Sequence, residues 1–392
     1  IMHYRYMHYA YIGFSLSFVY FCLQLQLIQM LFQVMFAAVV YKFIIRNRGS
    51  LEAFLFGFGL VIPFALYIPF FLLEELDIQN KSVKLGLTTL PVIVCFRTIE
   101  AMFSTPSNIV VEVAMGNYIA YYTTLCHFEW STKTLKRRKV TSGELLAAVG
   151  NLLLAFVRIS FMLSFMMHFN FQPFESPVKL DNYHLTFDLF SPAHLGNTYL
   201  LAILTYSYLS LGFYMSAFSE QAKGYYIQPL FLNPILMSRS VSEFWGKRWN
   251  LMIHRFLKHG VMRPAKKYYS TPVSIFLAFV FSGILHDYTW TIVFYHHSQD
   301  ECATCLDCDQ CFHFKPMKVS IFFLYCGLCM LLERPLSPYL GFFKSWPTPI
   351  VAQLVLLTGC PVSVVFTCAG LCPACQFQCY ALLTFSSLAF SF

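Results

Sequence analysis

A histidine and an aspartate stand side by side inside a long apolar stretch of this sequence. His286 and Asp287 lie past the middle of the run 272–295. Ionisable groups are costly inside a membrane, and they usually mark a substrate path or a reacting centre. Burial favours a neutral imidazole, which accepts a proton near neutral pH, so His286 is a candidate general base. The alternative is a structural histidine whose ring nitrogens are satisfied by neighbouring helices.

Asp287 follows His286 directly, so on a helix the two side chains point about 100° apart. A simple catalytic dyad is therefore not expected, and Asp287 is expected to serve a neighbouring helix. Glu333 ends another apolar run and precedes Arg334 and Pro335. Its expected roles are a pocket carboxylate, an interfacial ion pair or a contact at the helix end.

The segment 240–267 precedes the histidine run and is rich in basic and aromatic residues. Ser240 and Glu243 have the spacing of a capping box, which predicts that a helix begins at Ser240. Gly260, followed by Pro264, predicts the end of this helix. Four residues at helical spacing predict one apolar stripe: Trp245, Trp249, Met252 and Phe256. The polar residues Lys247, Asn250, His254 and Lys258 fall on the other side.

A short basic helix with tryptophans on its apolar face is typical of a helix lying in the membrane interface. The segment also carries candidate residues for a chemical reaction. Asn250 carries an amide donor for a carbonyl oxygen or an oxyanion. Lys247, Arg248 and Arg255 are candidate phosphate-binding residues, although binding of lipid phosphate or a role in topology explains them equally well.

The composition of the chain indicates that membrane-spanning helices position these candidate residues. Of the 392 residues, 57% are hydrophobic and 12% are charged, whereas soluble domains carry roughly 25% charged residues. The sequence therefore predicts an all-α, polytopic transmembrane helical bundle with one domain over 1–392. The net charge of +8 lies in loops and indicates orientation of the chain and contacts with anionic lipid or an anionic substrate, with no nucleic acid as partner.

A membrane-spanning helix needs about 20 mostly apolar residues. Seven segments meet this requirement: 14–41, 53–73, 145–168, 198–218, 272–295, 317–332 and 350–372. Two weaker ones are 85–96 and 109–126, which gives about seven to nine spans plus the interfacial helix. Because two full spans between Asn80 and His127 would give the wrong parity, one of these two is expected to be re-entrant or interfacial. No signal-peptide pattern precedes the first run, so that run is expected to direct insertion unless the chain is a fragment.

Basic loops assign the sides of the membrane. The run 133–139 and the segment 223–267 are strongly basic, which places them in the cytosol by the positive-inside rule. The acidic loops 169–197 and 296–315 then lie on the opposite side.

Two motifs together resemble the membrane-bound O-acyltransferase superfamily, and most closely its wax synthase branch, the long-chain-alcohol O-fatty-acyltransferases. The first is Ser242-Glu243-Phe244-Trp245-Gly246-Lys247-Arg248-Trp249-Asn250, and the second is Ser282-Gly283-Ile284-Leu285-His286-Asp287. Their order and spacing fit the family pattern, although Lys247 stands where arginine is common. The stretch from Phe322 to Glu333 is similar to the family's following helix, so the resemblance covers about 240–333.

The resemblance implies transfer of an acyl group from acyl-CoA to a lipid alcohol in the endoplasmic reticulum membrane, with no cofactor or metal. It makes His286 the general base and Asn250 the oxyanion donor. The candidate acyl-CoA contacts are Trp245, Lys247, Arg248, Trp249 and Arg255, and further pocket candidates are Asp287 and Glu333. The acceptor stays open between a long-chain alcohol, diacylglycerol and a sterol, and the oligomeric state is unknown.

Two cysteine clusters fall outside this resemblance. Cys302, Cys305, Cys308 and Cys311 form one, and Cys360, Cys368, Cys372, Cys375 and Cys379 form the other. Both contain C-x2-C pairs, so disulfides, metal sites and free thiols all remain open.

Other function classes have weaker support. The motifs of P-loop ATPases, G-x-S-x-G hydrolases and H-E-x-x-H proteases do not occur. A proton-coupled secondary transporter would use His286 and Glu333 as ion-path residues, but no internal repeat supports it. A non-catalytic membrane scaffold, with the cysteine loop as its binding module, is a third alternative.

Overall fold

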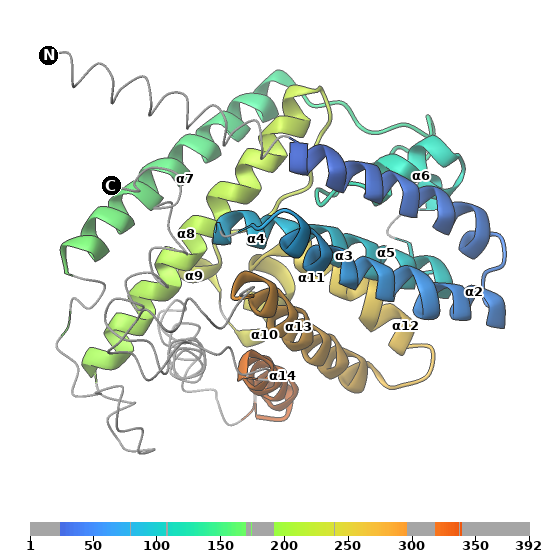
Figure 1. Ribbon diagram of the computed structural model, residues 1–392. Coiled ribbons are helices and arrows are strands. Elements are labelled where there is room, and N and C mark those ends of the chain that lie inside the picture. Colours follow the sequence, from blue (N-terminus) through green and yellow to red (C-terminus); the bar gives the residue numbers. More distant parts are fainter. Residues whose placement is uncertain are drawn as a thin grey trace, which may run out of the picture.

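The computed structural model describes residues 24–336 and Pro338, apart from 79, 107–108, 170–173, 175–191, 239 and 296–317. Over this part of the chain the regular elements are helices, accompanied by isolated β-bridges such as Phe128 with Ile227. Figure 1 shows the helices α2 to α6 gathered on one side, with the long pair α7 and α8 crossing on the other.

Two long apolar helices begin the described chain. The first, Gln24–Ile45, ends in the π-helical turn η1 (Val40–Ile45), and the second, Leu51–Glu75, consists of α2 (Leu51–Phe56), η2 (Gly57–Val61) and α3 (Ile62–Glu75). The hydroxyl of Ser50 accepts from the backbone N–H of Ala53 and caps α2. Gly57 allows close packing, because a Cβ there would lie 2.2 Å from the sulfur of Met102.

The central helix of this group is formed by α4 (Lys81–Leu87) and α5 (Thr89–Phe103). Together they give the candidate span Val83–Phe103, whose side chains are mostly buried inside the protein. The weaker expectation for 85–96 is thus confirmed as an apolar helix long enough to span. The other weak segment, 109–126, forms only η3 (Ile109–Glu112) and α6 (Met115–Tyr122), too short for a second span.

The helices α7 (Ser142–His168) and α8 (Pro192–Ala222) pack against each other and bury a second hydrophobic cluster around Ile159 and Leu204. Thr141 and Glu144 form a reciprocal capping box at the start of α7. Most of α7 faces away from the protein, as expected of a helix surrounded by lipid.

The stretch expected to be one interfacial helix from Ser240 to Gly260 is several short helices. A helix does begin at Ser240, whose hydroxyl accepts from the Glu243 N–H in α10 (Val241–Glu243). The chain continues through η5 (Phe244–Arg248) and breaks at Trp249 and Asn250 before α11 (Leu251–Leu257), because Asn250 is left-handed at φ 37°. The expectation of a continuous helix was therefore wrong.

The expected end at Gly260 was also wrong. Gly260 lies inside η6 (Lys258–Met262), and α12 (Arg263–Ala265) continues the path through Pro264. This glycine serves close packing, because a Cβ there would lie 2.8 Å from the ring of Phe96 in α5. The segment is consequently docked on α5 along this part, and Phe256 is almost fully buried.

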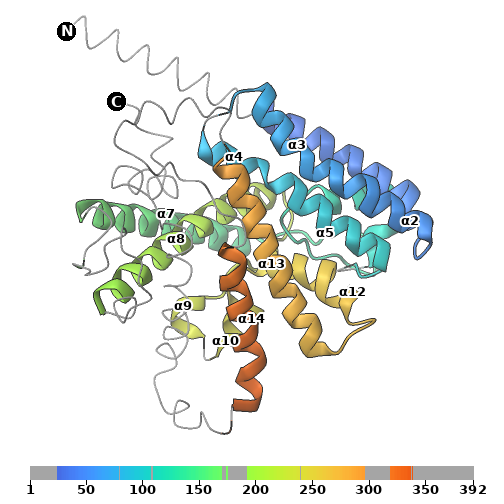
Figure 2. The ribbon, with the colours of Figure 1, turned by 60° about the horizontal axis from the view of Figure 1, so that its bottom comes forward.

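The last described helices are α13 (Thr271–Val293) and α14 (Lys318–Leu336), which run side by side (Figure 2). Gly283 lies at their contact, since a Cβ there would meet the Cα of Ser320 at 2.7 Å. The short helix α9 (Pro234–Met237) precedes α10.

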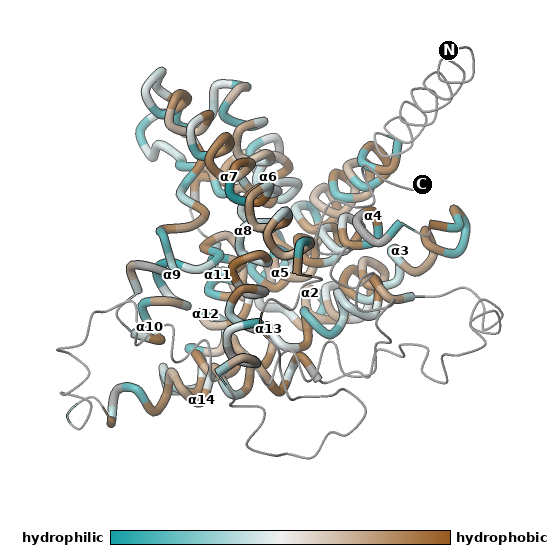
Figure 3. Tube along the Cα trace, turned by 90° about the vertical axis from the view of Figure 1, so that its left-hand side faces the viewer, coloured by the Kyte–Doolittle hydropathy of each residue, from teal (hydrophilic) through white to brown (hydrophobic). Residues whose placement is uncertain are grey.

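Five helices of the described part are long and apolar enough to cross a membrane: Gln24–Ile45, Leu51–Glu75, Val83–Phe103, Ser142–His168 and Thr271–Val293. Val319–Glu333 is apolar but shorter, and the expected span 350–372 and the C-terminal cysteine cluster lie outside the described residues. Hydrophobic residues follow these helices over much of their length in Figure 3. The chain is thus a polytopic helical membrane protein.

Candidate functional site

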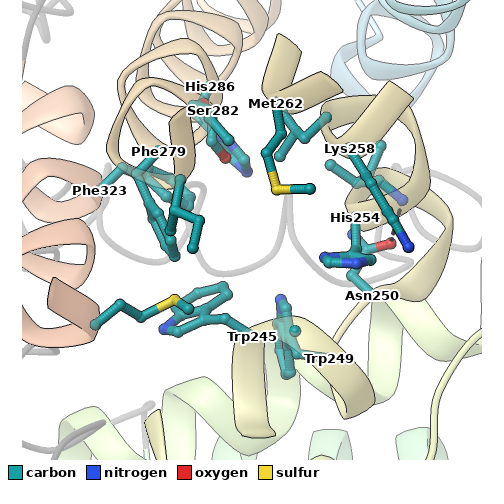
Figure 4. Close-up of a pocket in the computed structure, with 16 residues that line it drawn as sticks. Trp245, Trp249, Asn250, His254, Lys258, Met262, Phe279, Ser282, His286 and Phe323 are labelled. Atoms are coloured by element: carbon teal, nitrogen blue, oxygen red, sulfur yellow. Dashed lines mark hydrogen bonds between the residues drawn. The ribbon is translucent and has the colours of Figure 1, made fainter. Parts of the chain in front are cut away.

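A cavity of about 240 Å³ lies where η5, α11 and η6 meet α13 and α14. Figure 4 shows Trp245 and Trp249 on one side of this cavity and His286 and Ser282 across from them. Phe279 and Phe323 complete an apolar wall, and Met262 projects between the walls. Most of the lining is apolar, with a few polar groups, as is typical of ligand sites.

His286 reaches this cavity with one ring nitrogen already engaged. Its Nδ1 lies 2.6 Å from the carbonyl oxygen of Ser282, one turn earlier in α13. A carbonyl oxygen only accepts, so Nδ1 carries the hydrogen and the neutral ring presents Nε2 as an acceptor. The ring also packs on Phe323 of α14, with 4.3 Å between ring centroids. His286 is thereby held in the tautomer that a general base requires.

Asn250 lines the cavity at the break before α11. Asparagine tolerates the left-handed backbone region better than most residues, and its Oδ1 accepts from the Ile253 N–H at 3.3 Å. The side chain is therefore an N-cap of α11. Because the oxygen is used in this way, the amide NH₂ is the part of Asn250 that remains to donate to a bound molecule.

The polar face of α11 continues from Asn250 through His254 to Lys258, and all three residues line the cavity. Burial, followed by the nearby charges of Lys258 and Arg255, lowers the pKa of His254 to about 4. His254 is consequently neutral at neutral pH, whereas Lys258 supplies a positive charge. These three residues were predicted to lie on the helix side opposite the tryptophans, but the break at Asn250 brings both sets to one cavity.

The two tryptophans are fixed by other aromatic rings. Trp249 stacks on Phe244 with centroids 5.2 Å apart and also contacts Tyr206 of α8. The Trp245 ring packs edge-on against Phe279 of α13, with 5.9 Å between ring centroids, and at a tilt against Phe323 of α14, with 6.0 Å between centroids. Such ring pairs stabilise a fixed shape, so four separate elements contribute to one rigid apolar wall.

Comparison with known proteins finds a family match in this region. A model of the Membrane bound O-acyl transferase family matches residues 227–306, which include Trp245, Asn250 and His286. The match is to this segment of the chain. The family resemblance seen in the two sequence motifs is thereby confirmed.

Individual relatives are distant. The probable long-chain-alcohol O-fatty-acyltransferases 6 and 7 of Arabidopsis thaliana are 28% and 27% identical over 137 residues, 33% of this chain in each case. The acyl-CoA–sterol O-acyltransferase 1 of the same plant is 28% identical over 141 residues, 34% of this chain. These matches span 34%, 35% and 35% of the relatives' own lengths, about a third of each.

Three predicted phosphate contacts in this segment do not line the cavity. Lys247 is exposed on η5. Arg248 pairs with Glu243 at 2.7 Å and donates to the Leu232 carbonyl oxygen. Arg255 donates to the Pro229 carbonyl oxygen, and burial lowers its pKa to about 10. Both arginines therefore hold the chain segment around 229–232, and acyl-CoA binding by the three stays a prediction.

The two carboxylates predicted near the site contact helix starts. Asp287 accepts from the N–H groups of Val319 and Ser320, at 3.1 and 3.3 Å, and from the Ser320 hydroxyl. Glu333 accepts from both the N–H and the hydroxyl of Ser242 at 2.8 Å. Carboxylates at a helix N-terminus satisfy free N–H groups and favour the helix dipole. Asp287 thus serves the neighbouring helix, as expected, and Glu333 has the helix-end role among its predicted alternatives.

A buried polar network that was not predicted from the sequence lies behind α11. Arg97 and Glu100 of α5 pair at 2.9 Å with almost no exposure, and Tyr121 donates to Glu100 at 2.7 Å. The Arg97 guanidinium lies over the rings of Tyr121 and Phe256, 3.5 and 4.6 Å from their centroids. The available signal was an arginine and a glutamate three residues apart inside an apolar run.

Two histidines border this network in neutral form. His259 approaches Glu100 at 3.7 Å, but burial lowers its pKa to about 4, so this approach is no ion pair at neutral pH. Burial and the charge of Arg97 hold the pKa of His127 well below its usual value. None of the His, Cys, Asp and Glu side chains in the described part forms a metal-holding group of three.

Proposed function

We propose that this protein is an acyl-CoA-dependent O-acyltransferase that esterifies a long-chain alcohol within the membrane, as wax synthases do. The observation that carries the proposal is His286, with its Nδ1 engaged by Ser282 and its Nε2 left as acceptor beside a cavity that Asn250 also lines. This arrangement lies in the family-matched segment, and most of the relatives found are named as long-chain-alcohol O-fatty-acyltransferases. We further propose one acyltransferase-like domain in the endoplasmic reticulum membrane.

The first step joins the alcohol oxygen to the thioester carbonyl carbon. Nε2 of His286 takes the hydroxyl proton as the oxygen attacks, so a neutral nucleophile is not required to carry positive charge. The carbonyl oxygen becomes an oxyanion. The amide NH₂ of Asn250 donates to it, because the Oδ1 of that residue is engaged as the cap of α11.

The second step breaks the carbon–sulfur bond. The oxyanion re-forms a carbonyl, the CoA sulfur leaves, and the proton on His286 passes to that sulfur, so the ring returns to its starting state. The apolar wall around Trp245 and Phe279 suits both alkyl chains. Lys258 at the polar side supplies a positive charge for the anionic part of CoA.

A sterol is the second candidate acceptor, because one relative is named as an acyl-CoA–sterol O-acyltransferase. Diacylglycerol would undergo the same chemistry. A proton-coupled transporter is the alternative of another class, in which His286 would carry a transported proton.

The test uses microsomes that contain the wild-type chain or its His286→Ala variant at matched levels. Both receive labelled long-chain acyl-CoA with fatty alcohol, diacylglycerol and sterol, and the neutral lipids are separated. We expect a labelled wax ester from the wild type and at least a thousandfold less from the variant. Equal ester from both proteins would overturn the role of His286, and ester of another acceptor would correct the substrate.

A further inference from the structure

The second sequence motif divides into two helix faces with different tasks. Ser282 and His286 are one turn apart on α13 and face the cavity. Gly283 and Asp287 are also one turn apart and face α14 instead, where Gly283 lies against Ser320 and Asp287 accepts from Val319 and Ser320. Each pair is offset from the other by one residue, or about 100° around the helix.

Helix α14, which Asp287 holds, in turn contacts His286. Asp287 holds the first turn of α14 at Val319 and Ser320, and the next turn carries Phe323. Phe323 packs on the His286 ring at 4.3 Å and also on Trp245 at 6.0 Å. A closed path of contacts therefore runs from Asp287 through α14 and Phe323 to the imidazole next to it in sequence.

We propose that Asp287 and Gly283 are positioning residues, which set the orientation of the His286 ring by fixing α14 and hence Phe323. This inference rests on the proposed acyltransfer for its kinetic consequence, while the packing it describes is independent of any reaction. A base must lie within hydrogen-bond reach of the proton that it accepts. The Ser282 carbonyl oxygen contacts the ring edge and Phe323 contacts the ring face, and together they oppose rotation of the imidazole about its side-chain bonds.

Gly283→Ala is the most direct variant, because it leaves every polar group and charge of the site in place. The new Cβ would lie 2.7 Å from the Ser320 Cα, so α14 must move away. The matched control is Gly212→Ala in α8, where a Cβ would meet nothing within 4 Å. Phe323→Ala tests the other end of the path, and Asp287→Asn tests the cap while it keeps one acceptor oxygen.

Two measurements are made on each purified variant that accumulates to wild-type level. The first is ester formation, for which we expect kcat to fall about 10- to 100-fold in Gly283→Ala and Phe323→Ala with KM for acyl-CoA little changed. The double variant should be no worse than the more affected single one, because both act on the same contact. The kcat of Asp287→Asn should fall by a smaller factor, and the kcat of Gly212→Ala should equal that of the wild type.

The second measurement needs no turnover. Diethyl pyrocarbonate modifies accessible neutral imidazoles, and peptide mass spectrometry gives the rate for each histidine. We expect His286 to react several-fold faster in Gly283→Ala and Phe323→Ala, with the exposed His168 of α7 unchanged as the internal reference. Unchanged labelling of His286 in both variants would overturn the inference. If the wild type makes no ester, the proposed function fails, while the labelling rates still decide the role of α14.

Discussion

The two faces of α11 border two different polar systems. On one face Phe256 packs against Arg97, which pairs with Glu100 inside the protein. On the other face Asn250 and His254 border the cavity that His286 also reaches. Both systems place ionisable or hydrogen-bonding groups among apolar helices, where such groups are expensive.

The difference lies in what the polar groups bind. In the network the carboxylate of Glu100 accepts from Arg97 and Tyr121, so the two opposite charges are paired within the protein. In the cavity His286 uses Nδ1 and Asn250 uses Oδ1 for contacts within the protein, which leaves Nε2 and the amide NH₂ for a ligand. The network is thus suited to stability and the cavity to chemistry, although a single helix separates them.

Breaking the network should give the largest effect on stability. Arg97→Ala leaves Glu100 buried without its cation, and loss of one partner of a buried pair costs about 3–5 kcal/mol. We expect the variant to unfold at a much lower temperature in detergent, or to accumulate poorly. Lys223→Ala, which breaks a surface pair with Glu220, is the control and should cost under about 1 kcal/mol. Normal stability with lost ester formation in Arg97→Ala would place the network within the chemistry.

Asn250 tests this comparison within one side chain. Its Oδ1 caps α11 inside the protein, whereas its amide NH₂ is left to donate to a ligand. Asn250→Asp keeps the cap oxygen but loses the amide donor, and Asn250→Gly keeps the left-handed backbone without either group. We expect kcat to fall about a hundredfold or more in both, the cost of a lost oxyanion donor. Thermal unfolding in detergent should change little, because glycine at an N-cap costs a few tenths of a kcal/mol. An unchanged kcat would limit Asn250 to the cap.

His254 and His259 should make the stability of the fold depend on pH. This effect should be smaller than those of the Arg97 and Asn250 variants. His254 and His259 each have a folded pKa of about 4, below the usual 6.5. The unfolded chain therefore binds protons that the folded one does not as pH falls from about 6.5 toward 4, and folding loses stability over that window. We expect about 1 kcal/mol per pH unit from the buried His259, and less from the partly exposed His254.

Thermal unfolding between pH 7.5 and 5 measures this slope. His259→Gln should flatten it, whereas His168→Gln, at an exposed position of α7, should leave it unchanged. A slope that is the same in all three proteins would mean that other groups cause it.

Periodicity and composition predicted the long elements well. The spans expected at 53–73, 145–168 and 272–295 correspond to Leu51–Glu75, Ser142–His168 and Thr271–Val293. The short elements were predicted poorly at their ends. Gly260 was expected to end a helix, yet it is used for close contact with Phe96, because tertiary packing overrides local preference.

The sequence by itself determined a membrane protein of apolar helices, the two motifs that resemble the family, and His286 as an ionisable group in an apolar helix. These follow from composition, order and spacing, which are local properties of the chain. Only the tertiary structure decided that Asn250 breaks the helix and joins the tryptophans to the polar face of α11 around one cavity. It also decided that Asp287 and Glu333 cap other helices. Such roles depend on which helix lies nearby, and contacts between residues as far apart as Ser242 and Glu333 arise only when the helices pack.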